Sequence, residues 1–207
     1  MQSGSISFTR LFEYIKLQPE IPHKDDLTFS GFKDLYLELV KAIPNIPGWY
    51  AWIRHSAQGS QVVYLGQSQT RKTASLQARL REEFLDEFVA LWATVWSPET
   101  VMEILDEKYH GKYTTPIKRS IRKAGATHIL WLGRPHLTDE ELDVVEHNLI
   151  KRFNPPANKQ SRAYSNLYQE LTSEAANTLT CELTKLASKR DNATNTQNSS
   201  GSGLLQT

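Results

Sequence analysis

The chain has 207 residues, 39% of them hydrophobic, which is enough to bury one sizeable core, so we expect a single domain with appendages. The formal net charge of +1 excludes a strong overall attraction to nucleic acid, so any such binding needs a local basic patch. No apolar run approaches the roughly 20 residues that cross a bilayer, and the start MQSGSISFTR has no basic and apolar leader, so we expect a soluble cytoplasmic protein with no membrane partner.

The first half of the chain predicts a helix followed by a β-hairpin. Residues 1–29 have weak periodicity and contain the stretch PEIPHKDD, so we expect an N-terminal extension there. Ser30 is the expected cap of the helix GFKDLYLELVKAI, which prolines then end. Residues 48–54 and 61–66 are rich in β-forming residues and are separated by the polar HSAQG, which predicts an antiparallel hairpin.

The second half predicts helices around one more strand. From about Thr73 to Leu91 the apolar spacing is helical, and THILWLG, residues 127–133, suits a buried third strand. Thr138 and Glu141 then have the spacing of a capping box at the start of a helix that NPPAN ends.

These elements predict an α+β fold, with a small three-stranded, mainly antiparallel sheet flanked by helices and helical additions at both ends. The main domain spans residues 30–164 and contains a basic insertion at about 85–126. A C-terminal helix is expected within 165–189, from about Ser173 to Ala187. The remaining residues, 190–207, are rich in Asn, Thr, Ser and Gly and predict a disordered tail.

A basic stretch, KYHGKYTTPIKRSIRK, occupies residues 108–123 and contains no acidic residue. Basic side chains interleaved with tyrosines suit phosphate contact and base stacking, although a solvated helix face has the same composition. The candidate DNA-binding residues are Lys112, Lys118, Arg119, Arg122 and Lys123.

The hairpin carries two tyrosines at mirrored positions, in Gly48-Trp49-Tyr50 and Tyr64-Leu65-Gly66. A phenol has a reference pKa near 10, so tyrosines alone are ordinarily packing residues. Glu146 changes this interpretation, because it lies at the edge of the apolar stripe of its helix, where a carboxylate needs a partner. That partner is a metal ion, an arginine or a solvent-filled cleft, and an ordinary interfacial Glu is the alternative.

In chain order these residues form a pattern that resembles the GIY-YIG nucleases. The pattern spans about residues 46–160, and its Glu-to-Asn block, EHNLIKRFNPPAN, is similar to that of the incision subunit of bacterial nucleotide excision repair. Its members are Gly48-Trp49-Tyr50, Tyr64-Leu65-Gly66, Arg79-Leu80, Glu146 and Asn158.

The resemblance implies a metal-dependent DNA endonuclease of restriction or repair and recombination type. It implies that one tyrosine, assisted by the other, positions or deprotonates the water that attacks phosphorus. Arg79 would then stabilise the charge on the phosphate, and Glu146 would hold Mg²⁺ or Mn²⁺. Asn158 would orient the substrate or brace the site.

Two departures from the family pattern leave alternatives open. The stretch before Arg79 carries a small insertion, so Arg81 is a rival for the arginine role. Glu83 stands where many family members have Tyr or His, and at i,i+4 it can pair with Arg79 on the helix surface and partly neutralise it. The alternative function is therefore a catalytically inactive nucleic-acid-binding module on the same fold.

Overall fold

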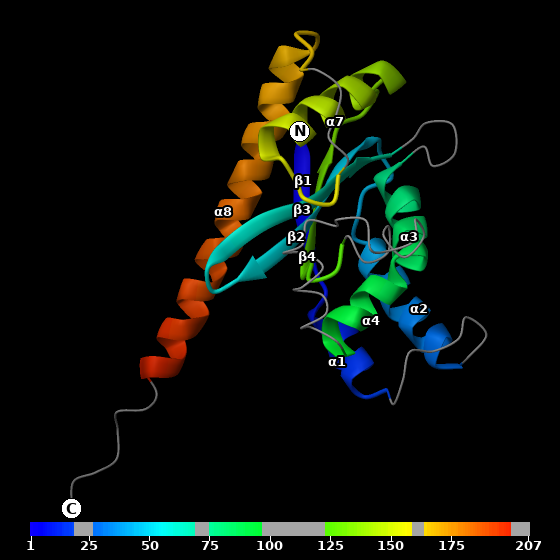
Figure 1. Cartoon of the computed structure of the whole chain (residues 1–207), viewed down its shortest axis with the longest axis vertical. Coiled ribbons are helices and arrows are strands. Elements are labelled where there is room, and N and C mark those ends of the chain that lie inside the picture. The colour runs from blue at the N-terminus through cyan, green and yellow to red at the C-terminus, as the bar shows by residue number, and fades with distance from the viewer. Residues whose placement is uncertain (19–26, 69–74, 97–122, 159–163, 200–207) are drawn as a thin grey trace, which may run out of the picture.

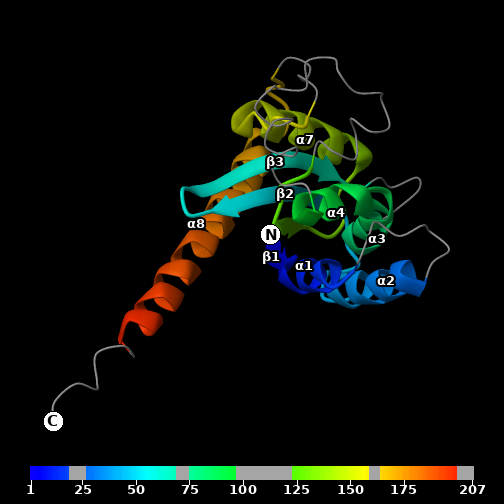
Figure 2. The ribbon, with the colours of Figure 1, turned by 60° about the horizontal axis from the view of Figure 1, so that its bottom comes forward.

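A computed structural model describes residues 1–18, 27–68, 75–96, 123–158 and 164–199 of the chain. Four antiparallel strands form one sheet in the order β1-β4-β2-β3, so the predicted α+β class is confirmed. The sheet lies between α1 to α4 on one face and α7 with α8 on the other (Figures 1 and 2). The strands are β1 (Gln2–Ser7), β2 (Gly48–Ser56), β3 (Gly59–Gln67) and β4 (His128–Gly133). The described helices are α1 (Thr9–Lys16), α2 (Leu27–Val40), α3 (Leu76–Asp86), α4 (Phe88–Trp96), α7 (Asp139–Phe153) and α8 (Gln169–Ser199).

The N-terminal residues belong to the core, so the expectation of an extension over residues 1–29 and of three strands was wrong. β1 pairs with β4 along its whole length, from Gln2 opposite Gly133 to Ser7 opposite His128. β1 escaped prediction because its sequence, QSGSIS, buries only one side chain, Ile6. Gly4 has no room for a side chain, because a Cβ there would be 2.7 Å from the Trp131 ring of β4.

Two helix boundaries also differ from the prediction. α2 begins at Leu27, so Ser30 lies inside the helix instead of capping it. The helix expected from about Thr73 to Leu91 is two helices, because Glu87 between them has a non-helical backbone. The predicted apolar stripe is nevertheless buried along both helices, at Leu76, Leu80, Phe84, Phe88 and Leu91.

On the other face of the sheet, the predicted start of α7 is confirmed and the predicted end of α8 was wrong. α7 begins at the predicted capping box of Thr138 and Glu141 and ends at Asn154 in the left-handed conformation. α8 continues to Ser199, so the expected tail overlaps this helix and only residues 200–207 lie outside the described part. Among the described residues, no helix, α8 included, is long and apolar enough to span a membrane.

The two glycines of the hairpin motif are needed for different contacts. Gly48 lies opposite Gly133 of β4, and a Cβ there would collide with the backbone carbonyl oxygen of Leu132. Gly66 lies opposite Tyr50, and a Cβ there would be 2.5 Å from the phenol oxygen of that ring. The first glycine therefore permits a close backbone approach, and the second leaves the space that a tyrosine occupies.

We predict that Gly48→Ala destabilises the protein by about 2–3 kcal/mol, because two backbones must separate. The Tm should fall by roughly 5–10 °C for a chain of this length. Gly66→Ala should lower the Tm less, because the far end of a side chain can move more cheaply than a strand. Thermal denaturation followed by circular dichroism measures both, and a larger loss for Gly66→Ala than for Gly48→Ala would contradict this interpretation.

Candidate active site

The two tyrosines lie side by side on the face of the hairpin that α3 covers. The register places Tyr50 opposite Gly66 and Trp52 opposite Tyr64, so the tyrosines are diagonal neighbours on two adjacent strands. Their ring centroids are 6.2 Å apart, and their hydroxyls share a hydrogen bond. The mirrored Gly and Tyr positions thus bring two phenol oxygens together over one glycine.

Arg79 extends from α3 to the first of these phenols. Ser75 caps α3, and the apolar stripe docks this helix so that Arg79 Nε donates a 3.2 Å hydrogen bond to Tyr50 Oη. Arg81 is exposed and acts electrostatically on Tyr36, whose pKa burial raises to about 12. Of the two rival arginines, Arg79 is therefore the one that contacts the tyrosines, and its catalytic role stays a prediction.

Glu146 approaches the tyrosines from the opposite face of the sheet. β3 is an edge strand, so α7 can bring Glu146 beside this edge, where it shares a hydrogen bond with Gln67 at the end of β3. The pKa of Glu146 is raised to about 8: burial is the largest cause and Asp143 adds to it, while Arg79 and the hydrogen bond with Gln67 oppose the shift. The predicted need of this carboxylate for a partner is thus visible in its environment.

The same enclosure disfavours ionised phenols. Burial is the largest cause that raises the pKa of both Tyr50 and Tyr64, and Glu146 raises both further. Arg79 lowers the pKa of each, and a hydrogen bond with Tyr50 also lowers that of Tyr64. Tyr50 is only 1% exposed, whereas Tyr64 is partly exposed. Of the two phenols, Tyr64 is therefore the one that solvent or a ligand can reach.

Asn158 braces the free edge of β3. Its side-chain oxygen accepts from the Leu65 backbone N–H and its amide donates to the Leu65 carbonyl, both at 2.8 Å. The neighbouring Ala157 N–H donates to the Val63 carbonyl at 3.0 Å. Of the two roles that the resemblance implies for Asn158, the geometry supports bracing.

Lys123 is not a surface residue, so its predicted contact with DNA was wrong. Lys123 is only 5% exposed, and its ammonium forms ion pairs with Glu83 and Glu87. The composition of a basic stretch does not indicate which of its side chains is buried. Lys123 is the last residue of the stretch 108–123. The other four candidates, Lys112, Lys118, Arg119 and Arg122, lie outside the described residues.

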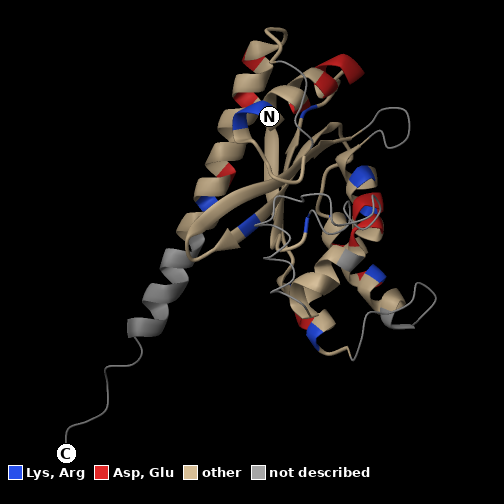
Figure 3. Cartoon of the chain, in the orientation of Figure 1, with Lys and Arg blue, Asp and Glu red and all other residues tan. Residues whose placement is uncertain are grey.

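Glu83 does pair with Arg79, as its spacing allowed, but not on the helix surface. Its Oε2 lies 2.5 Å from Arg79 Nη2, and the residue is only 1% exposed. α3 carries both basic and acidic residues (Figure 3), with two arginines followed by Glu82, Glu83 and Asp86. The burial of Glu83 means that its charge acts on Arg79 with little screening by solvent.

The oxygen atoms around Glu146 fit a hard divalent cation. Gln67 Oε1 is buried and has no hydrogen-bond partner among the described residues. Mg²⁺ commonly takes one or two carboxylates and completes its shell with water and phosphate oxygens. The described part of the chain contains no cluster of three or more His, Cys, Asp or Glu side chains that could hold a metal ion, and the candidate donors here are the Glu146 carboxylate and the Gln67 amide oxygen. Gln67 was not predicted; its position directly after the second glycine motif is the signal that marks it.

No family model, curated protein or solved structure matches this chain. Family membership and activity are therefore proposals that rest on the motif residues and on the contacts described above.

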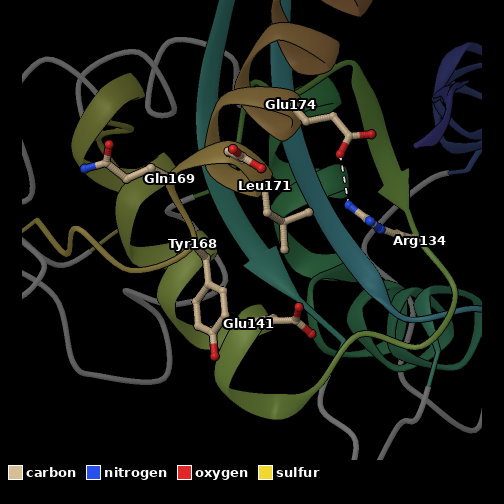
Figure 4. Close-up of a pocket in the computed structure, with 7 residues that line it drawn as sticks. Arg134, Glu141, Tyr168, Gln169, Leu171 and Glu174 are labelled. Carbon is tan, nitrogen blue, oxygen red and sulfur yellow. Dashed lines mark hydrogen bonds and ion pairs between the residues drawn. The ribbon is translucent and has the colours of Figure 1, made fainter.

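A separate pocket of about 520 Å³ lies between the starts of α7 and α8 (Figure 4). Arg134 points to Glu174 across it at 3.0 Å, and the backbone amino group of Met1 also contacts Glu174 at 3.0 Å. Glu141 is used in the capping box of α7. Glu174 thus pairs with the positive charges of Arg134 and the Met1 amino group. The pocket includes none of the predicted site residues.

We predict that Glu146→Gln stabilises the metal-free protein increasingly as the pH rises. The raised pKa of Glu146, about 8, keeps the carboxyl protonated in the folded state over most of the range from pH 5 to 8, whereas the unfolded state releases the proton near the ordinary carboxyl pKa of 4.5. Unfolding therefore releases protons between these values, and the wild type loses stability there as pH increases. The Tm of Glu146→Gln minus that of wild type, measured in EDTA, should grow from pH 5 to 8 and then level off.

The matched control is Glu140→Gln, an exposed position on the same helix with the same change in charge. Its Tm difference should follow pH less steeply. A Tm difference for Glu146→Gln that stays flat over this range would show that the carboxyl ionises in the folded state at ordinary pH.

Proposed function

We propose that the chain is a metal-dependent DNA endonuclease of the GIY-YIG type, acting in restriction or in repair and recombination. The observation that carries the proposal is the hydrogen-bonded series of Arg79, Tyr50 and Tyr64, which faces Glu146 across the edge of β3. We assign β2, β3 and β4 to the three-stranded GIY-YIG-like core and treat β1 with α1 as an addition to it.

Hydrolysis of a phosphodiester requires a positioned water and positive charge on the phosphate oxygens. Tyr64 suits the first role because it is partly exposed and its ionised form would accept the hydrogen bond that it shares with Tyr50. Arg79 suits the second, because a guanidinium has five N–H donors and those not directed at Tyr50, Glu82 and Glu83 can bind a phosphate oxygen.

Glu146 and Gln67 would hold the cation, Mg²⁺ or Mn²⁺. When bound, it supplies a Lewis acid for the leaving oxygen and favours the loss of a proton from nearby water. Glu146 must give up its own proton to bind the ion, because ligating carboxylates are deprotonated. Loss of the proton and binding of the cation are thus coupled at this partly buried carboxyl.

The test is cleavage of supercoiled plasmid, branched DNA and single-stranded DNA with Mg²⁺ or with EDTA. We expect Mg²⁺-dependent cleavage of at least one substrate and none in EDTA. Glu146→Gln should reduce the rate on the order of a hundredfold or more, while binding of DNA in Ca²⁺ persists because the shape of the site is retained. Cleavage that survives both EDTA and Glu146→Gln would refute the metal assignment.

A second prediction separates the two arginines. Removing a cation that contacts the transition state costs about 3 kcal/mol, or on the order of a hundredfold in rate. Arg79→Ala should lose this factor in single-turnover cleavage at saturating DNA. Arg81→Ala, two residues along the same helix but exposed, should stay within severalfold of wild type. Equal losses in the two variants would argue against a specific contact by Arg79.

The inactive binding module is the second candidate, and the Arg79–Glu83 ion pair is the observation that favours it. A neutralised arginine would bind the phosphate less strongly in the transition state. Binding to the DNA panel without cleavage of any member, in Mg²⁺ and in Mn²⁺, would favour this module over the enzyme.

A further inference from the structure

Three charged side chains are buried directly behind the proposed active site. We call them the buried charge cluster: Glu83, Glu87 and Lys123, which are 1%, 6% and 5% exposed. They lie beside large apolar side chains, with the Lys123 ammonium 5.3 Å from the ring centroid of Trp52. Ions in such surroundings lose their hydration, and apolar residues of similar volume often serve stability as well. The cluster therefore needs an explanation beyond packing.

The contacts of Glu83 suggest an explanation for the buried charge cluster. Its Oε2 accepts from Arg79 Nη2 at 2.5 Å, and its Oε1 accepts from the ammonium of Lys123. A carboxylate and a guanidinium prefer to pair through two parallel hydrogen bonds. Here Lys123 takes the second oxygen of Glu83, and Arg79 Nε donates to Tyr50.

Lys123 also touches the second tyrosine. Its ammonium lies 4.2 Å from the ring centroid of Tyr64, within the range of a cation–π contact, and 3.0 Å from Glu87 Oε1. One end of the cluster thus contacts Tyr64, and the other reaches Tyr50 through Arg79.

We propose that Glu83 and Lys123 are positioning residues, which hold the Arg79 guanidinium so that its Nε donates to Tyr50 and the Nη N–H groups not paired with Glu82 and Glu83 are left for the substrate. Lys123 binds one oxygen of Glu83, so Arg79 and Glu83 cannot form a pair with two parallel hydrogen bonds. In such a pair Arg79 Nε would donate to Glu83 instead of Tyr50. The catalytic consequence rests on the proposed nuclease function, whereas the positioning itself does not.

The test uses nuclear magnetic resonance of the full chain with ¹⁵N-labelled arginine. The Nε–H resonance of Arg79 is assigned by its loss in Arg79→Lys, and its exchange with water is measured. Two variants break the positioning: Lys123→Met, and the triple variant Glu83→Met, Glu87→Met, Lys123→Met, which removes the cluster without leaving an unpaired buried ion. Circular dichroism verifies that each variant is folded. The matched control is Glu87→Gln, which alters another contact of Lys123 but leaves the Arg79–Glu83 pair in place.

We expect exchange of the Arg79 Nε–H to accelerate at least about tenfold in both positioning variants and to stay at the wild-type rate in Glu87→Gln. The single-turnover cleavage rate should fall on the order of a hundredfold in the positioning variants with DNA affinity little changed, because a displaced reacting group costs about this much. Unchanged exchange in a folded positioning variant overturns the proposal, as does wild-type cleavage by a variant whose exchange has accelerated. A wild-type protein that cleaves nothing refutes the proposed function, and the exchange rates still decide whether Glu83 and Lys123 position Arg79.

Discussion

Tyr50 lies over Gly66 in the β2–β3 hairpin, and the position of each proposed functional group follows from this pairing. Successive residues of a strand point to opposite faces, so a slip of β3 by one residue against β2 would move Tyr64 to the side of α7 and α8, away from Tyr50. That side is filled by Trp49, Ala51 and Leu65, which are all buried. Both faces of the hairpin are packed, and the packing on each face determines the same register. The two phenols therefore lie on the α3 side of the hairpin.

The edge of β3 gives the site access from both faces of the sheet. An edge strand leaves backbone groups unpaired and invites association with other chains. Here the loop after α7 pairs with that edge through Asn158 and Ala157, which bond to Leu65 and Val63. The brace shields the strand without covering it with a further strand, so a residue of α7 can approach side chains from the opposite face. A strand added beyond β3 would separate Glu146 from the tyrosines.

Local signals predicted the parts of the fold that local interactions determine. The hairpin has alternating β-forming residues around a polar turn, and α7 has a complete capping box, so both were found from sequence. β1 was missed because QSGSIS has no hydrophobic alternation and its pairing partner, β4, is distant in sequence. Lys123 was misassigned for the same reason, since its partners Glu83 and Glu87 are some 40 and 36 positions earlier in the chain.

The charges at the site depend on the aromatic core that surrounds them. Phe8, Phe84 and Trp52 pack edge to face or tilted with ring centroids 5.4–5.9 Å apart, and Phe32 and Trp92 extend the same cluster. Such rings exclude water, which strengthens the ion pairs of Glu83 and disfavours the ionised form of Tyr50. Glu146 lies on the other face of the sheet, where its own burial raises its pKa, so the fixed arginine and the protonated carboxyl have separate origins. A divalent cation bound at Glu146 would replace the proton of this carboxyl without admitting solvent to the pairs behind Arg79. The apolar core can thus hold the arginine in place before and after an ion binds, while the proton on Glu146 is the part of the site that changes.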